Sequence, residues 1–390
     1  MQKAVDPLWC VAIAAALAGA AWITIVGLQP GQLTMDWTNK DFANYWVAPR
    51  LAFEGRVLEV FAPHETYFAH MQAFFGADYP WHSWSYPPHY LLLMQPLGLL
   101  PYKVAYLAFL FGTALILCGA VHIACRRLGW WQLVLLLPAV LTNAITAQNG
   151  FLLGAFMLAG LALRDKRPVI AGICLGLLTV KPQLGVLLPF LLLYERQWRV
   201  IISACLTTAV LVLVSALVYG VEAWAGYIAH VVPYQTVIMR QFEGLFLYMM
   251  PTVFGSVRSL GGDATTAFAF HVPFALAVLA LYGFSLPRLA RGPARAASTV
   301  FATPLVVPYL LSYDIVALAV AAVLWVDHGR FSPAQRIGLI VLVSMPLLMP
   351  ILGIVGWPIA PLVILLAWLV LLHQEGALPR LTRSPTPSTP

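Results

Sequence analysis

Runs of about 20 residues without a charged side chain constrain the fold of this chain more than any other feature. The clearest runs are residues 8–28, 104–125, 200–219 and 264–287. Each matches the hydrocarbon thickness of a bilayer, where only a helix or a closed barrel satisfies its own backbone hydrogen bonds. We therefore expect an all-α polytopic membrane protein, with residues 8–28 as a retained first helix rather than a signal peptide.

The composition agrees with a chain that lies mainly in lipid. Of its residues, 61% are hydrophobic and 9% are charged, whereas a soluble domain carries about a quarter charged residues. The net charge is +7, but the basic residues form short, dispersed clusters instead of one stripe, so we expect no nucleic-acid partner. The five cysteines lie in apolar runs without a C-x-x-C pair, which argues against a disulfide framework or a thiolate metal site.

The distribution of basic residues predicts the orientation. Short turns rich in arginine and lysine are assigned to the cytoplasm by the positive-inside rule, and these are residues 126–127, 164–167, 196–199, 288–295, 330–336 and 380–383. Most acidic residues fall elsewhere, so residues 29–87 and 220–262 are expected to be periplasmic loops. The predicted organisation is a single domain over residues 1–380 in a bacterial inner membrane, followed by a disordered cytoplasmic tail, residues 381–390.

Two apolar stretches contain prolines that predict broken segments. The stretch "YLLLMQPLGLLPYK" has Pro96 and Pro101 as breaks, and "VIAGICLGLLTVKPQLGVLLPFLLLY" turns midway at Lys181–Pro182. In the first hydrophilic loop, aromatic residues recur near helical spacing over residues 42–53 and 61–75, which suits helices lying in the headgroup layer. An aromatic belt that only anchors the loop is the alternative for most of these side chains.

Several motifs in a fixed order resemble one enzyme family. They are "KDFANYW", "YPPHYLLLMQPLGLLP", "AQNG", "AGICLGLLTVKPQLGVLLPFLLLYERQWR" and "PYLLSYDIVAL", and they resemble glycosyltransferase family 87, whose members are mannosyltransferase-like membrane proteins of the GT-C fold. The resemblance implies a polyprenyl-phosphate sugar donor, an inverting transfer at the periplasmic face and a catalytic Asp in the first periplasmic loop. The acceptor is expected to be a glycolipid or a glycan, and membrane lipids surround the chain.

Asp41 is the predicted catalytic residue. An inverting transfer needs one carboxylate to take the proton from the acceptor hydroxyl while that oxygen attacks the anomeric carbon. Asp41 follows the first helix closely and stands beside Phe42, Tyr45 and Trp46, whose rings can stack on sugar faces. The alternative is that Asp41 only caps the helix that begins at Phe42, and Asp36 is the reserve candidate for the base.

Cationic side chains outside the cytoplasmic clusters are the predicted donor-phosphate ligands, namely Lys181, Arg240 and Arg258. Lys181 is the most informative, because a lysine inside an apolar segment is costly unless it faces a polar cavity. Snorkelling to the interface or pairing with a carboxylate is an equal alternative for Lys181, and lipid-headgroup contact is the alternative for both arginines. Asp314 is suited to holding Lys181, to binding a sugar hydroxyl or to binding a metal.

The remaining predicted substrate-binding residues are polar or aromatic side chains near the expected site: Tyr45, Trp46, Tyr86, Gln148, Asn149, Tyr313 and Asp314. Hydrogen bonding between helices is an equal alternative for Gln148 and Asn149. We expect no metal and no other cofactor, because the histidines lack a ligand spacing and no phosphate-binding glycine pattern is present. Two other function classes stay open, a transporter or flippase of a lipid-linked or sugar substrate and a structural subunit that presents loops to a partner enzyme.

Overall fold

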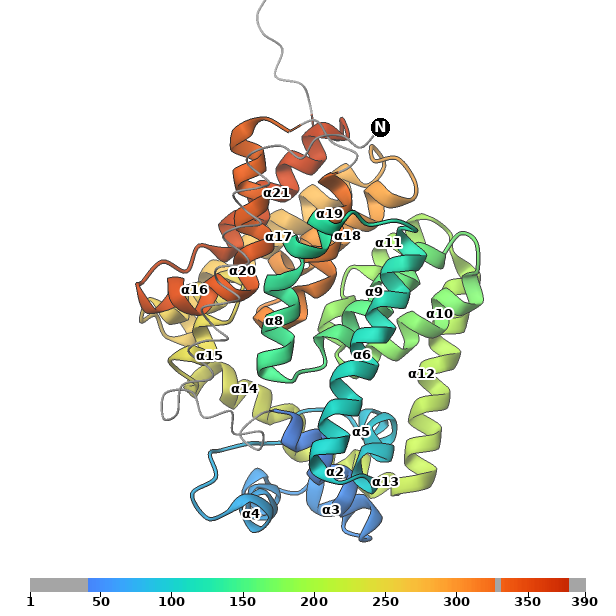
Figure 1. The fold of residues 1–390 in the computed structure, drawn as a ribbon, viewed down its shortest axis with the longest axis vertical. Coiled ribbons are helices and arrows are strands. Elements are labelled where there is room, and N and C mark those ends of the chain that lie inside the picture. The colour runs from blue at the N-terminus through green and yellow to red at the C-terminus, as the bar shows by residue number, and fades with distance from the viewer. Residues whose placement is uncertain (1–40, 327–330, 379–390) are drawn as a thin grey trace, which may run out of the picture.

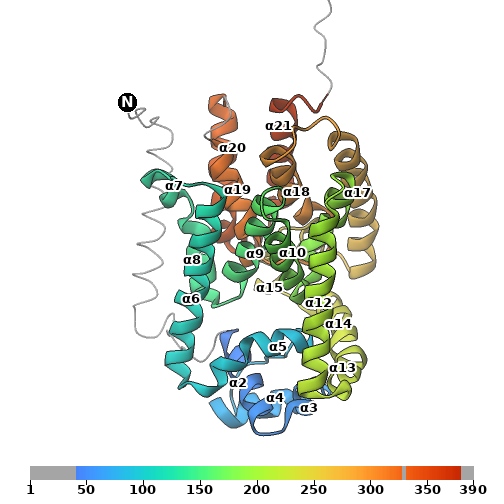
Figure 2. The same cartoon turned by 90° about the vertical axis from the view of Figure 1, so that its right-hand side faces the viewer.

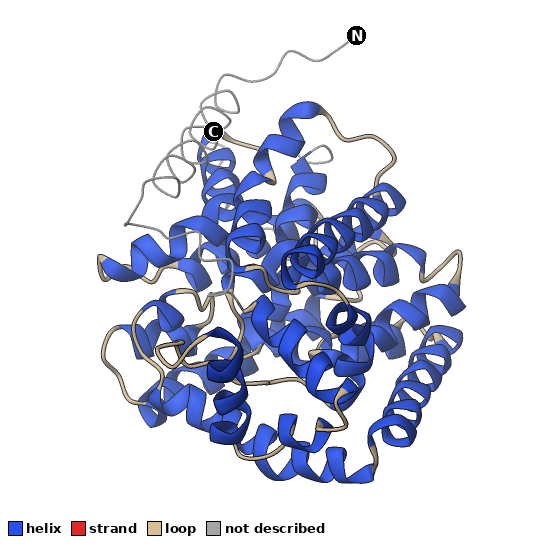
Figure 3. Cartoon of the chain, turned by 60° about the horizontal axis from the view of Figure 1, so that its bottom comes forward, coloured by secondary structure: helices blue, strands red, loops and turns tan. Residues whose placement is uncertain are grey.

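The computed structural model describes residues 41–326 and 331–378, and helices are the regular elements of this part of the chain (Figures 1 and 3). The α-helices of the first half are α2 (Phe42–Phe53), α3 (Val57–Val60), α4 (His64–Phe75), α5 (Pro88–Met94), α6 (Tyr102–Ala124), α7 (Trp130–Leu135), α8 (Leu137–Thr146), α9 (Gly150–Leu163), α10 (Pro168–Leu177) and α11 (Leu188–Tyr194). Those of the second half are α12 (Trp198–Tyr219), α13 (Val221–Gly226), α14 (Val232–Gln241), α15 (Leu245–Tyr248), α16 (Val253–Ser259), α17 (Ala264–Ser285), α18 (Pro293–Val306), α19 (Val316–Val326), α20 (Pro333–Ile354) and α21 (Ala360–Gln374).

Four of these helices are long and apolar enough to cross a membrane: Tyr102–Ala124, Trp198–Tyr219, Ala264–Ser285 and Pro333–Ile354. The first three confirm predicted spans, and the predicted first helix, residues 8–28, lies outside the described residues. Six shorter apolar helices of 10–17 residues accompany them. The expected class, an all-α polytopic membrane protein, is therefore confirmed.

Proline breaks divide the predicted broken segments as expected. The chain runs through α10 and the 3₁₀ turn η2 (Leu178–Val180), turns at Lys181, and returns through η3 (Pro182–Gly185) and α11. Likewise α5 passes into the 3₁₀ turn η1 (Gln95–Leu99), which contains Pro96, before Pro101 precedes α6. Each proline lacks the N–H that would continue the preceding helix, so a chain reversal within an apolar segment has a local cause.

Small residues hold α10 against α12. A Cβ atom added at Gly172 would lie 2.4 Å from the Ser203 Cβ, and one added at Gly176 would lie 2.7 Å from the Thr207 Cβ. Because both pairs advance by four residues, the two helices run parallel and begin at the same end of the molecule. Glycines four residues apart allow this close approach of two apolar helices.

Helices α2–α5 form a layer at one end of the molecule, beside α13 and the end of α12 (Figure 2). Nine of the twelve residues of α2 are buried, including Phe42, Tyr45 and Trp46. These rings pack against α6, where the Phe42 ring centroid lies 5.2 Å from that of Tyr106. Phe42, Tyr45 and Trp46 are thus core residues and not an anchoring belt, because the loop folds back onto the bundle, whereas Phe53 at the end of α2 is exposed.

Candidate active site

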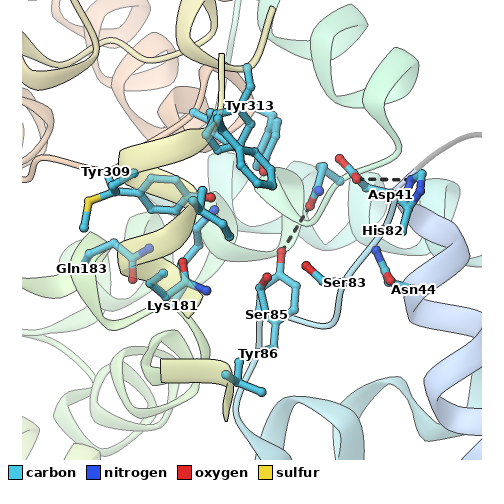
Figure 4. A pocket seen from close by; sticks show the side chains of 18 of the residues that line it. Asp41, Asn44, His82, Ser83, Ser85, Tyr86, Lys181, Gln183, Tyr309 and Tyr313 are labelled. Atoms are coloured by element: carbon cyan, nitrogen blue, oxygen red, sulfur yellow. Dashed lines mark hydrogen bonds and ion pairs between the residues drawn. The ribbon is translucent and has the colours of Figure 1, made fainter. Parts of the chain in front are cut away.

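A cavity of about 610 Å³ lies between the α2–α5 layer and the rest of the bundle. Its walls come from the start of α2, the extended stretch 81–87, Gln148 between α8 and α9, the Lys181 turn, the α14–α15 region, and residues 308–313, which lead into η5 (Ser312–Ile315). Asp41, Asn44 and His82 lie on one side, and Lys181, Gln183 and Tyr309 lie on the other (Figure 4). Residues as far apart in sequence as Asp41 and Tyr313 therefore face one space.

Asp41 stands at the polar side of this cavity. It occupies the N-cap position of α2, but its side chain accepts no capping hydrogen bond, so the structure does not support the helix-cap alternative. The carboxylate is 44% exposed, and its Oδ1 atom lies 3.8 Å from Nε2 of His82. The Nδ1 atom of His82 lies 2.9 Å from the Pro80 carbonyl oxygen, which orients the ring toward Asp41.

Two tyrosines and one amide make a hydrogen-bonded cluster in the cavity wall. The Tyr45 hydroxyl donates to Gln148 Oε1 at 2.6 Å, and the Tyr86 hydroxyl lies 2.8 Å from the Tyr45 hydroxyl and 3.3 Å from the same Oε1 atom. Burial raises the pKa of the Tyr86 phenol well above its usual range, which keeps it protonated and able to donate. Gln148 therefore connects α2 and the 81–87 stretch to the start of α9.

A buried ion pair closes the opposite side. The Lys181 ammonium lies 2.7 Å from both carboxylate oxygens of Asp314, and it stands 4.9 Å from the centre of the Tyr313 ring. The Leu311 amide also donates to Asp314 Oδ2 at 3.0 Å. Of the three roles considered for Asp314, the geometry supports the one in which it holds Lys181. The same pairing means that Lys181 does not snorkel to the surface.

The "AQNG" motif has a structural role at each end. Ala147 adopts a left-handed backbone conformation with φ 49°, which ends α8 and reverses the chain before Gln148. Gly150 starts α9 directly against the Tyr313 backbone, and an added Cβ atom would lie 1.9 Å from the Tyr313 carbonyl oxygen. Only glycine fits this contact, which brings Gln148 and Tyr313 to the same cavity.

The cavity wall formed by α14–α15 is mainly apolar, with Gln235 as a polar side chain. Ile238, Met239, Phe242, Leu245, Phe246 and Met249 line it. Polar side chains face this wall from the stretch 81–87, where Ser83, Ser85 and Tyr86 border the same space. The cavity therefore offers an apolar surface and a hydrogen-bonding surface to one occupant.

Five of the predicted residues border the cavity: Asp41, Tyr86, Gln148, Lys181 and Tyr313. Two others, Tyr45 and Asp314, hold bordering side chains in place. Four predicted residues lie elsewhere: Trp46, Asn149, Arg240 and Arg258. The Trp46 indole donates to the Leu100 carbonyl, and Asn149 is buried beside Tyr90. The alternative site base, Asp36, lies outside the described residues.

The two arginines predicted to bind phosphate lie outside the cavity wall. Arg258 donates to the carbonyl oxygens of Met239, Arg240 and Phe242, so its guanidinium satisfies the end of α14. Arg240 is exposed on α14, one residue beyond the cavity-lining Met239. The sequence alone does not show which backbone carbonyl groups an arginine in a loop will hydrogen-bond.

Several polar or aromatic cavity residues were missed in the sequence, among them Asn44, His82, Ser83, Gln183 and Tyr309. The signal for two of them was the run "WHSWSYPPHY", in which polar residues alternate with aromatic ones without a metal-ligand spacing. Gln183 follows Lys181 by two residues on the same turn, so the turn that exposes one side chain to the cavity exposes both.

Comparison with protein families matches residues 84–312 to glycosyltransferase family 87. The comparisons with curated proteins and with solved structures gave no match. The matched segment includes Tyr86, Gln148 and Lys181, whereas Asp41 precedes it and Asp314 follows it. Because the match covers more than half of the sequence, the chain belongs to glycosyltransferase family 87.

Proposed function

We propose that this glycosyltransferase moves a hexose, namely mannose, from a polyprenyl-phosphate donor to a glycolipid or glycan acceptor at the periplasmic face of a bacterial inner membrane. One observation carries the proposal: a single cavity combines a half-exposed carboxylate, a buried ammonium group and an apolar wall. A lipid-linked sugar phosphate has the matching parts, which are a hydroxyl-rich ring, an anionic phosphate and a long hydrocarbon chain.

Asp41 acts as the general base in this proposal. Its carboxylate takes the proton from an acceptor hydroxyl, the acceptor oxygen forms a bond to the anomeric carbon, and the bond from that carbon to the phosphate oxygen breaks. The electron pair leaves with the lipid phosphate, and the configuration at the anomeric carbon inverts. The half-exposed position of Asp41 supports this role, because a base must reach an acceptor that enters from outside.

Lys181 is the proposed donor to the leaving phosphate. The ion pair with Asp314 is neutral overall, so Lys181 offers one remaining N–H bond and not an uncompensated positive charge. The Gln183 side chain, which borders the same cavity, adds amide N–H donors. Family membership favours this transferase over the transporter and structural-subunit alternatives.

Sugar transfer from synthetic polyprenyl-phosphate mannose, measured with the purified full chain in detergent, tests the proposal. Asp41→Asn keeps the shape of the side chain but removes the proton acceptor. We expect a loss of at least about 100-fold in turnover, because general-base catalysis typically contributes about 100-fold to 10,000-fold. Donor binding and folding should be kept, since the Asp41 side chain makes no capping hydrogen bond.

Asp78→Asn is the matched control, because Asp78 is an exposed carboxylate in the same loop outside the cavity wall. It should turn over like the parent. Near-normal turnover of Asp41→Asn would remove Asp41 from the mechanism. Failure of the parent to transfer from any polyprenyl-phosphate sugar, with a soluble nucleotide sugar accepted instead, would overturn the proposed donor class.

A further inference from the structure

A second cavity, of about 410 Å³, is bordered by the residues after α9, by the starts of α10 and α12, and by Arg291 between α17 and α18. Figure 2 shows α12 running from its start toward the α2–α5 layer, so this cavity lies at the end of α12 that is farther from the layer. Four arginines and one acidic residue line it: Arg164, Arg196, Arg199, Arg291 and Asp165. Four guanidinium groups against one carboxylate make this lining strongly cationic, whereas the lining of the candidate active-site cavity has one lysine and one aspartate.

The acidic groups near this cavity already have partners. Asp165 accepts hydrogen bonds from Gln197 and Arg291, each at 2.7 Å. The buried Glu195 carboxylate accepts from Arg164 at 2.8 Å and from Arg295 at 3.4 Å. These bonds hold the side chains around the cavity in place and neutralise the Asp165 and Glu195 carboxylates.

Two exposed arginines keep their charge available. In residues 41–326 and 331–378, Arg196 and Arg199 have no acidic partner within ion-pair distance. Arg196 also holds a left-handed backbone conformation with φ 54°, at the turn that joins α11 to α12. The guanidinium groups are planar forks of donors that fit the oxygens of a phosphate.

The ends of two helices add to the positive potential. The parallel packing of α10 and α12 places their N-termini side by side, and neither has a side-chain cap. Uncapped first-turn N–H groups and aligned helix dipoles favour an anion. At this cavity the two helix N-termini add to the positive potential of the arginines.

The surface beyond this cavity is apolar. Trp198 is 56% exposed at its rim, and the outer faces of α10 and α12 continue with exposed Val169, Ile173, Ile202 and Leu206. A soluble phosphate would leave this surface without a partner. An anionic phospholipid would place its phosphate among the arginines and its acyl chains along the two helices.

We propose that the cavity bordered by Arg164, Arg196, Arg199 and Arg291 binds the phosphate of an anionic phospholipid from the surrounding leaflet. The phosphate monoanion of the lipid matches the arginine cluster, and its hydrocarbon chains match the adjacent apolar surface of the helix pair. The site is separate from the proposed catalytic cavity, so it does not depend on which sugar is transferred.

Native mass spectrometry of the purified full chain tests this with phosphatidylglycerol and phosphatidylcholine of identical acyl chains. The parent should retain phosphatidylglycerol preferentially. In Arg196→Gln/Arg199→Gln, this retention should fall about 30-fold, because each of the two basic groups contributes about 1 kcal/mol near a membrane surface and every 1.4 kcal/mol is a factor of ten. Arg199→Gln alone leaves the unusual backbone at Arg196 unchanged and should give a smaller loss.

Arg126→Gln/Arg127→Gln is the matched control. It also removes two positive charges, but these arginines follow the end of α6 and do not line this cavity. It should retain phosphatidylglycerol like the parent. Equal losses in both double variants would overturn the proposal in favour of general surface charge. Displacement of the lipid by inorganic phosphate at low concentration would also overturn it, by identifying a site for a free anion.

Discussion

The Lys181–Asp314 pair is a buried ion pair in the wall of the candidate active-site cavity. It joins two chain reversals, the Lys181 turn and η5, that are 133 residues apart in sequence. Both charges are nearly inaccessible to solvent. Removal of two charges from water is costly, so their mutual attraction and the added Leu311 amide bond offset that cost without a large surplus.

Removal of one partner should therefore be worse than removal of both. Asp314→Asn leaves an unpaired buried ammonium group, and we expect a loss of about 3–5 kcal/mol in the free energy of unfolding. Lys181→Met/Asp314→Leu replaces the pair with apolar groups and should be closer to the parent. Thermal unfolding of the purified variants in detergent measures both effects.

The double variant also separates folding from donor binding, which Lys181→Met alone cannot do because it strands Asp314. If Lys181 contacts the donor phosphate, the stable double variant should bind polyprenyl-phosphate mannose more weakly than the parent. Parent-like binding would assign the ion pair to architecture alone. Parent-like stability of Asp314→Asn would contradict the energetic account.

At the level of elements, the α10–α12 pair determines where several side chains lie. Gly172 and Gly176 let the helices approach until the Ser203 hydroxyl donates to the Val169 carbonyl at 2.8 Å. The end of α10 leads into the Lys181 turn, and its start borders the arginine cavity. One helix contact therefore positions groups at both cavities.

Gly176→Leu should separate these helices. A side chain there would meet the Ala204 carbonyl oxygen and the Thr207 side chain, and overpacking of this kind typically costs about 1–3 kcal/mol. Gly119→Leu on α6 is the control, because an added Cβ atom there has open space. The thermal unfolding temperature should fall for Gly176→Leu only. Equal unfolding temperatures for the two variants would mean that the helix pair tolerates separation.

The sequence predicted elements better than it predicted contacts. Apolar length and proline are local properties, so α6, α12, α17 and the Lys181 turn could be found from the residues alone. The donor role of Arg258 toward carbonyl groups at the end of α14, and the burial of Trp46 against the Leu100 carbonyl, depend on neighbours far along the chain. Lys181 was informative because its cost inside an apolar segment is also a local property.

The whole molecule has two chemically different ends. The candidate active-site cavity lies beside the α2–α5 layer, and the arginine cavity lies at the start of α12, the end of that helix farther from the layer. Basic groups are retained on the cytoplasmic side of membrane proteins, so the arginine end is expected to be cytoplasmic and the α2–α5 end periplasmic. This orientation would deliver sugar to acceptors outside the cytoplasm.

Cysteine labelling tests the orientation in a variant whose five native cysteines are replaced by serine. A cysteine introduced by Asp78→Cys should react with an impermeant reagent added to cells with an intact inner membrane. One introduced by Arg126→Cys should react only after that membrane is opened. The reverse pattern would invert the molecule and place the chemistry in the cytoplasm.

The apolar α14–α15 wall has a consequence for how a lipid-linked sugar could be turned over. Extraction of a lipid chain from a bilayer costs about 0.8 kcal/mol for each methylene group that becomes exposed to water. If the donor is the proposed polyprenyl-phosphate sugar, a wall of Ile238, Phe242 and Phe246 would keep its chain in contact with apolar groups while the head group meets Asp41 and Lys181. The lipid carrier would then stay within the bilayer throughout the transfer and could afterwards diffuse away in the plane of the membrane.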